Sequence, residues 1–86
     1  MIEQWAQCRE ILSAAVVGFR LGMEGQASEK LVAFVDIFLP ILQEGANIDI
    51  ELVNGLLTDL LASQARKDFA RVADILEYEI KPLLQR

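Results

Sequence analysis

The sequence predicts an all-α fold, a small bundle of four helices built from two αα-hairpins. Apolar residues recur at steps of three and four in four successive segments, which is the period of an amphipathic helix. No segment alternates apolar and polar residues as a half-buried strand would. The chain has 86 residues and contains neither a linker nor a low-complexity tract, so we expect one helical domain over residues 1–86.

The first helix is expected over residues 2–23. Ala14, Gly18 and Gly22 follow one another at steps of four, so small residues line one side of this helix and would let another backbone approach closely. Because glycine costs roughly 1 kcal/mol relative to alanine inside a helix, Gly18 indicates a packing requirement. The apolar stripe of the helix consists of Trp5, Cys8, Leu12, Ala15 and Phe19.

The second helix is expected over residues 28–43, with Ser28 as its N-cap. Pro40 has no amide hydrogen and its ring would collide with the carbonyl of Asp36, so the helix should kink there or end soon after. A helix that is apolar nearly all round is buried on most sides, so this one is either central in the monomer or the middle of an interface. Its thin polar stripe consists of Glu29, Ala33, Asp36 and Gln43.

The third helix is expected over residues 50–65, with Asp49 as its N-cap and Ile48 placed to pack on Val53.

A tight turn at residues 64–67 and an N-cap at Asp68 then begin a fourth helix. One continuous helix through residue 79 is the alternative, since neither Gly nor Pro interrupts this stretch. The stripe of the fourth helix consists of Phe69, Val72, Leu76, Ile80 and Leu83. On its far side, Glu77 and Lys81 form an i,i+4 pair, and Pro82 interrupts the last turn.

The two halves of the chain contain similar segments. Residues 10–16 resemble residues 51–57, an offset of 51 − 10 = 41, and residues 40–43 resemble residues 82–85, an offset of 82 − 40 = 42. A helical hairpin used twice would explain the shared spacing. Chance similarity between leucine-rich helices is the other explanation.

Charge and apolar length exclude two classes of partner. With 8 Lys and Arg against 13 Asp and Glu, the net charge is −5, which is the wrong sign for holding a phosphate backbone, so no nucleic acid is expected. The longest apolar stretch, residues 31–42, is shorter than the about 20 residues needed to cross a bilayer. No membrane span is expected.

The sequence contains few of the residue combinations that catalysis or redox chemistry requires. The chain has no histidine, so Ser-His and Cys-His nucleophile pairs are missing, and we expect no enzyme, metal site or cofactor. The acid pairs Glu3 with Glu10 and Asp74 with Glu77 fit solvated faces. Asp36 has such apolar surroundings that it should be exposed, hydrogen-bonded or shifted in pKa.

The single cysteine and the absence of a basic N-terminal segment indicate a cytoplasmic, reducing compartment, with this thiol buried.

Surplus hydrophobicity predicts a binding partner. Hydrophobic residues make up 53% of a chain too short to bury them all, so we expect a homodimer. The leading function is a non-enzymatic interaction module, an adaptor, scaffold or small chaperone whose groove accepts an apolar helix of another protein. The candidate interface consists of Trp5, Ala14, Val17, Gly18, Leu21, Phe34, Ile37 and Phe38.

Two other functions remain as alternatives. The first is a carrier of a small apolar ligand held between helices, and the second is an enzyme that uses carboxylates alone. In size and helical make-up the chain resembles small bacterial adaptor and export-chaperone bundles, but no motif assigns it to a family. The residues expected to line a ligand cavity are Phe34, Phe38, Leu57 and Leu76.

Overall fold

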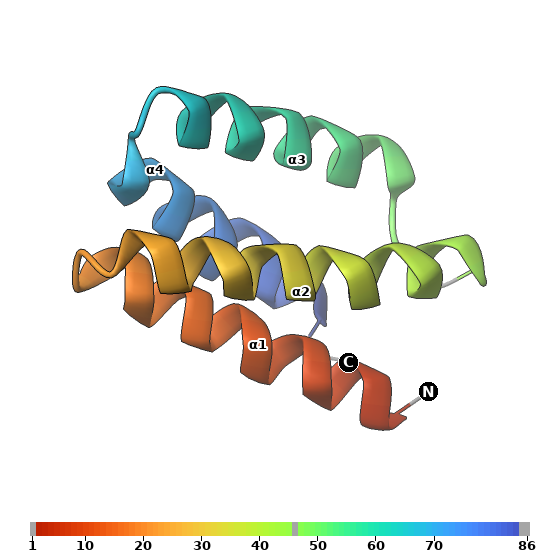
Figure 1. Ribbon diagram of the computed structural model, residues 1–86. Coiled ribbons are helices and arrows are strands. Elements are labelled where there is room, and N and C mark those ends of the chain that lie inside the picture. Colours follow the sequence, from red (N-terminus) through yellow and green to blue (C-terminus); the bar gives the residue numbers. More distant parts are fainter. Residues whose placement is uncertain (1, 46, 85–86) are drawn as a thin grey trace.

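The protein is a bundle of helices joined by short turns, as the computed structural model shows (Figure 1). The structure describes residues 2–45 and 47–84, and these contain no strand. The predicted all-α bundle is therefore confirmed, as is the separation of the third and fourth helices. The elements are α1 (Ile2–Arg20), α2 (Glu24–Gln43), α3 (Ile50–Ala65) and α4 (Phe69–Asp74), which continues as a π-helical segment, η1 (Ile75–Ile80), and a 3-10 segment, η2 (Lys81–Leu84).

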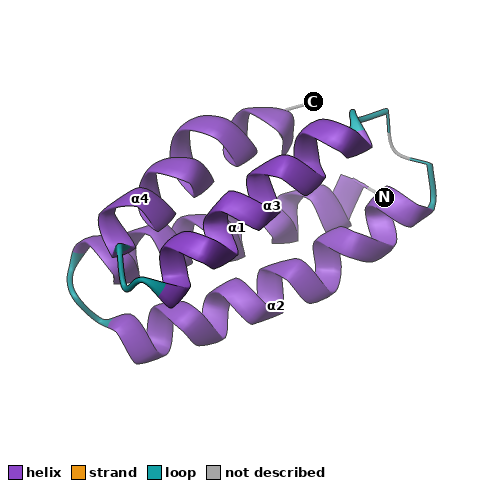
Figure 2. Cartoon of the chain, turned by 90° about the horizontal axis from the view of Figure 1, so that it is seen from above, coloured by secondary structure: helices purple, strands orange, loops and turns teal. Residues whose placement is uncertain are grey.

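The helices run alternately up and down. The turns that join α1 to α2 and α3 to α4 lie at one end of the bundle, and the connection between α2 and α3 lies at the other (Figure 1). Seen from above, α3 lies over α1, with α2 and α4 on the two sides (Figure 2). Helix α1 packs closely on α2 and on α4, and α3 packs on α4 and η1. Because α2 and α3 share few close backbone contacts, the bundle is open on that side.

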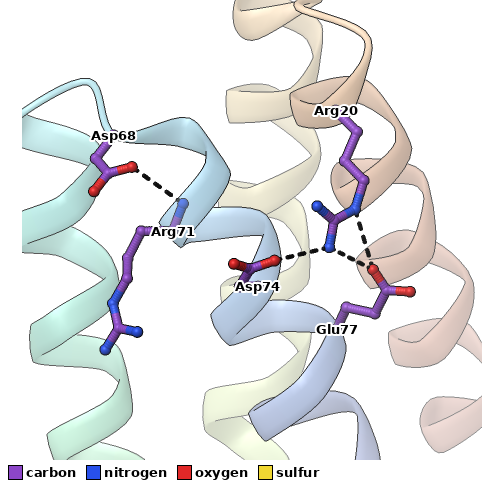
Figure 3. Close-up of polar contacts among 5 residues, drawn as sticks. All are labelled: Arg20, Asp68, Arg71, Asp74 and Glu77. Carbon is purple, nitrogen blue, oxygen red and sulfur yellow. Dashed lines mark hydrogen bonds and ion pairs between the residues drawn. The ribbon is translucent and has the colours of Figure 1, made fainter.

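Two predicted N-caps are confirmed. The Asp49 carboxylate accepts hydrogen bonds from the backbone N–H groups of Glu51 (3.0 Å) and Leu52 (3.2 Å) at the start of α3. The Asp68 carboxylate accepts one from the N–H of Arg71 (3.2 Å) at the start of α4 (Figure 3). The backbone N–H groups in the first turn of a helix have no carbonyl acceptor within the helix, and the two carboxylates accept their hydrogen bonds instead. This explains why both helices begin where the sequence predicted.

A glycine cap ends α1 at Arg20, three residues before the predicted end. Gly22 has φ +77°, a left-handed conformation that glycine adopts without a steric cost. The N–H of Met23 donates to the carbonyl of Gly18 (2.8 Å), and the N–H of Gly22 donates to the carbonyl of Phe19 (3.3 Å). This pattern closes the helix and reverses the chain, so α2 begins at once.

Helix α2 departs from its prediction at its start. It begins at Glu24, so Ser28 lies inside the helix and is not its N-cap. The Ser28 hydroxyl instead accepts a hydrogen bond from the Gln64 side chain of α3 (3.2 Å). At the other end the helix stops soon after Pro40, at Gln43, as one predicted alternative required. The solvent-exposed side of α2 is also wider than expected, because Val32 and Leu39 are exposed beside the predicted polar stripe. Helix α2 is therefore not central in the monomer.

The core is one cluster of buried apolar side chains drawn from every helix. The rings of Phe34 and Phe38 stack inside it with centroids 5.1 Å apart, and Phe19 stacks on Phe69 at 5.5 Å. The stripes predicted for the first and fourth helices face this core. Their fully or almost fully buried members are Cys8, Leu12, Ala15 and Phe19 in α1, and Val72, Leu76 and Ile80 in α4 and η1.

Gly18 brings α1 and α2 unusually close. A methyl group added at Gly18 would lie 2.8 Å from the Cβ of Ala27, a separation that real side chains do not adopt. The predicted packing requirement at Gly18 is therefore confirmed, and the backbone that approaches it belongs to α2 of the same chain. This contact fixes how the two helices face each other.

The last helix changes its hydrogen-bond register near Pro82. Proline has no N–H to donate to the carbonyl four residues earlier, and its ring crowds that carbonyl. The N–H of Lys81 donates to the carbonyl of Leu76, five residues back, which is the π-helical pattern. The wider turn places Ile75, Leu76 and Ile80 together in the core.

The structure places the similar segments of the two halves in corresponding helices. Residues 10–16 lie in α1 and residues 51–57 lie in α3, while Pro40 lies in α2 and Pro82 in η2. Residue 85, the end of the last segment, is outside the described residues. A duplicated hairpin stays a prediction.

Candidate functional site

An open apolar groove runs between α2 and α3, on the side where the bundle does not close. It has a volume of about 300 Å³ and is called the α2/α3 groove below. Its walls are aliphatic apart from two polar side chains. The lining residues are Leu31, Val32, Val35, Asp36 and Leu39 of α2, and Leu57, Leu60, Leu61 and Gln64 of α3.

The groove exists because each helix carries more apolar surface than the core covers. On α3, Val53 and Leu60 are buried, whereas Leu61, on the neighbouring flank, is 60% exposed. On α2, Val32 is 61% exposed. Isolated exposed apolar side chains are common on proteins, but a contiguous set that lines a concave surface is typical of a binding site.

The polar groups of the groove lie at its wall and at one end. Asp36 is exposed and is the one charged side chain among the lining residues, so the first of its three predicted outcomes holds. The hydrogen bond from the Gln64 side chain to the Ser28 hydroxyl joins α3 to α2 and limits how far the two helices can separate there. The groove therefore has a defined shape, with one acidic position.

The predicted interface residues differ in how far the structure buries them. Gly18, Phe34 and Phe38 are buried within the chain, so they leave the candidate interface. The two phenylalanines lie on the face of α2 that points into the core. Trp5 and Ile37 are half-buried and Ala14 is exposed.

The exposed members form a second apolar surface at the end of α1. Val17 is 55% exposed and Leu21 is 69% exposed. Ala14 and Val17 also line a shallow depression that reaches Met23 at the start of α2. We call Ala14, Val17, Leu21 and Met23 the α1 surface.

The residues predicted to line a ligand cavity are not brought together around the groove. Phe34, Phe38 and Leu76 are fully buried in the core, and only Leu57 of that set lines the groove. Sequence reasoning missed Val32, Leu39 and Leu61 as site residues. A signal was present, because α3 carries two adjacent leucine stripes where one is enough to reach the core.

The carboxylates form ion pairs that connect helices. The Arg20 guanidinium of α1 donates to Glu77 (2.7 Å) and to Asp74 (3.1 Å), as Figure 3 shows. It also lies 5.9 Å from the ring centre of Tyr78. The hydrogen bonds to Glu77 and then Asp74 raise the pKa of Arg20. The predicted Glu77–Lys81 pair is thus replaced by a contact with α1.

The described residues hold no group of three or more Cys, Asp or Glu side chains placed to bind a metal ion. The side chain of Glu3 lies outside this description. Cys8 is fully buried, and burial raises the pKa of its thiol, with the nearby charge of Arg9 acting in the opposite direction. A raised pKa disfavours the reactive thiolate.

Among the described helices, none combines the length and apolarity that a bilayer crossing needs. No protein-family model matches the chain, and comparison with curated proteins and with solved structures finds no significant similarity. The features of the chain that indicate a function are therefore its two apolar surfaces, the α2/α3 groove and the α1 surface.

Proposed function

We propose that the protein is a non-enzymatic interaction module that binds a helix of another protein in the α2/α3 groove. The observation that carries the proposal is the exposed aliphatic lining between two helices that share few close contacts. Roles as an adaptor, a scaffold or a small chaperone all use such a groove. A cytoplasmic location belongs to the proposal and is supported by the single, buried cysteine.

A helix suits the groove better than an extended strand. The lining offers side chains and no unpaired strand edge, so an occupant must satisfy its own backbone hydrogen bonds, as a helix does. The α2 wall extends from Leu31 to Leu39, which is eight steps along the helix or about 12 Å. This length matches about two turns of a partner helix, with apolar anchors at positions i, i+3 or i+4, and i+7.

Replacing Leu61 by glutamate is expected to weaken binding of such a helix at least tenfold, because the change places a charge among apolar side chains that the complex buries. The probe is a fluorescently labelled peptide of about 18 residues with a leucine stripe and a neutral, glutamine-rich polar face, long enough to be helical. Fluorescence anisotropy with the full chain gives the dissociation constant.

The matched control is Leu52→Glu. Leu52 is 47% exposed on α3 but does not line the groove, so the same chemical change there should leave the dissociation constant nearly unaltered. Equal weakening by both variants, or no binding to the unmodified chain, would contradict the proposed function.

The homodimer is the second part of the proposal, and the exposure of Val17 and Leu21 supports it. We expect light scattering after size exclusion to give twice the chain mass at tens of micromolar. Val17→Glu should return the mass to that of a single chain, because it places a charge in the α1 surface. A strictly monomeric mass for the unmodified chain would refute the dimer, and Leu61→Glu serves as the control that leaves the mass unchanged.

A further inference from the structure

We propose that the α2/α3 groove selects a basic amphipathic helix, one that carries Lys or Arg two turns apart beside its apolar stripe. The inference rests on the proposed function and names the chemistry of the partner. Its basis is the Asp36 carboxylate, the one charged side chain among the residues that line the groove, together with Glu29, seven residues earlier on the same helix.

Asp36 is the acidic position in the groove lining. Its carboxylate lies in the groove wall between the apolar side chains of Val32 and Leu39. None of the ion pairs formed among the described residues involves Asp36. Docking of an apolar helix would reduce the contact of this carboxylate with water, and a cation on the partner would offset that cost.

Glu29 is a second carboxylate on α2, two residues before Leu31, where the groove lining begins. It is exposed and precedes Asp36 by seven residues, so the two carboxylates lie on the same side of α2, about 10.5 Å apart along the helix axis.

The opposite wall of the groove, formed by α3, carries no compensating positive charge among its lining residues. Helical spacing places Asn54, Thr58 and Ala65 on the same flank of α3 as Leu61, and all three are exposed and uncharged.

A second copy of this chain is a poor occupant of the groove. A two-fold contact centred there would bring the two Asp36 carboxylates together, and like charges that lose water destabilise a contact. Two of the chain's own basic side chains that could complement them, Arg20 and Arg71, are already paired with acids of the same chain. The charge of the groove therefore favours a basic helix from another protein.

The test compares two peptides that share the leucine stripe of the neutral probe. One has two lysines seven residues apart at the edge of the stripe, and the other has glutamates at the same positions. We expect the lysine peptide to bind the full chain at least tenfold more tightly at low salt, with the difference shrinking as ionic strength rises. Equal dissociation constants for the two peptides would overturn the inference.

Reversing the charge at Asp36 tests whether the preference for the lysine peptide originates in the groove. Asp36→Lys should invert the preference, so that the glutamate peptide binds more tightly, and Asp36→Asn should reduce the preference without inverting it. Glu10→Lys is the matched control, because Glu10 is exposed on α1 outside the groove and its reversal changes the net charge equally. An equal effect of Glu10→Lys would show that net charge, and not the groove, selects the peptide.

The outcomes separate this inference from the proposed function. If both peptides bind equally and Leu61→Glu abolishes both, the groove binds helices but the charge selectivity is wrong. If neither binds, or if Leu61→Glu has no effect, the proposed function is wrong as well. A doubled chain mass that Leu61→Glu returns to monomer would instead make the groove a self-interface and overturn the inference.

Discussion

Replacing Phe38 by alanine is expected to lower the free energy of unfolding by about 3–5 kcal/mol. The Phe38 ring is fully buried and stacks on Phe34 with centroids 5.1 Å apart. Its removal leaves a cavity between α2 and the rest of the core, and the surrounding helices relax only partly to fill it. Urea unfolding followed by circular dichroism measures the loss.

The control for this substitution is Val32→Ala, an apolar truncation on the same helix at an exposed position. It should change the free energy by no more than about 0.5 kcal/mol. A domain of this size has about 4 to 13 kcal/mol of stability, so Phe38→Ala alone could unfold it. Phe38→Leu, which removes less volume, then gives a measurable intermediate loss. A loss below about 1 kcal/mol for Phe38→Ala would show that the ring is not part of the packed core.

The second large effect is expected at Gly18, where leucine should cost at least about 2 kcal/mol and lower the melting temperature. The first carbon of any side chain there would meet the Cβ of Ala27 at 2.8 Å, and the backbone of Ala27 is 3.3 Å away. Backbone cannot move aside as the end of a flexible side chain can, so α1 and α2 must separate. Of the row of small residues that suggested close packing, Gly18 has its partner inside the chain, whereas Ala14 and Gly22 are exposed.

Gly55→Leu is the matched control for Gly18→Leu. Gly55 also lies within a helix, α3, but a Cβ there would meet nothing within 4 Å. Leucine should therefore be neutral or stabilise the protein by up to about 1 kcal/mol through its higher helix propensity. Equal melting temperatures for Gly18→Leu and the unmodified chain would show that the close approach of α1 and α2 is incidental.

Local features of the fold could be predicted from the sequence because short-range chemistry determines them. The third helix has the predicted bounds, since Asp49 supplies its cap and a turn follows Ala65. The start of α4 at Phe69 was predicted from Asp68 for the same reason. Where the turn residues were ambiguous, as at Ser28, the start of the helix was predicted four residues too late.

The candidate site was harder to predict because it depends on how each helix is rotated about its own axis. Apolar residues surround nearly all of α2, so periodicity could not show whether Phe34 and Phe38 or Val32 and Leu39 would face the core. Both phenylalanines were predicted to lie at an interface, but the structure buries them. Likewise, spacing along one helix paired Glu77 with Lys81, whereas the bundle brings Arg20 to Glu77.

By itself the sequence determined the all-α class, the caps of α3 and α4, the close-packing role of Gly18 and a surplus of apolar surface. The tertiary structure decided where that surplus is exposed. Each residue turns the helix by about 100°, so a modest rotation of α2 exchanges one apolar flank for another. That rotation is set by contacts between helices, such as Gly18 with Ala27, which lie outside any pattern within a single helix.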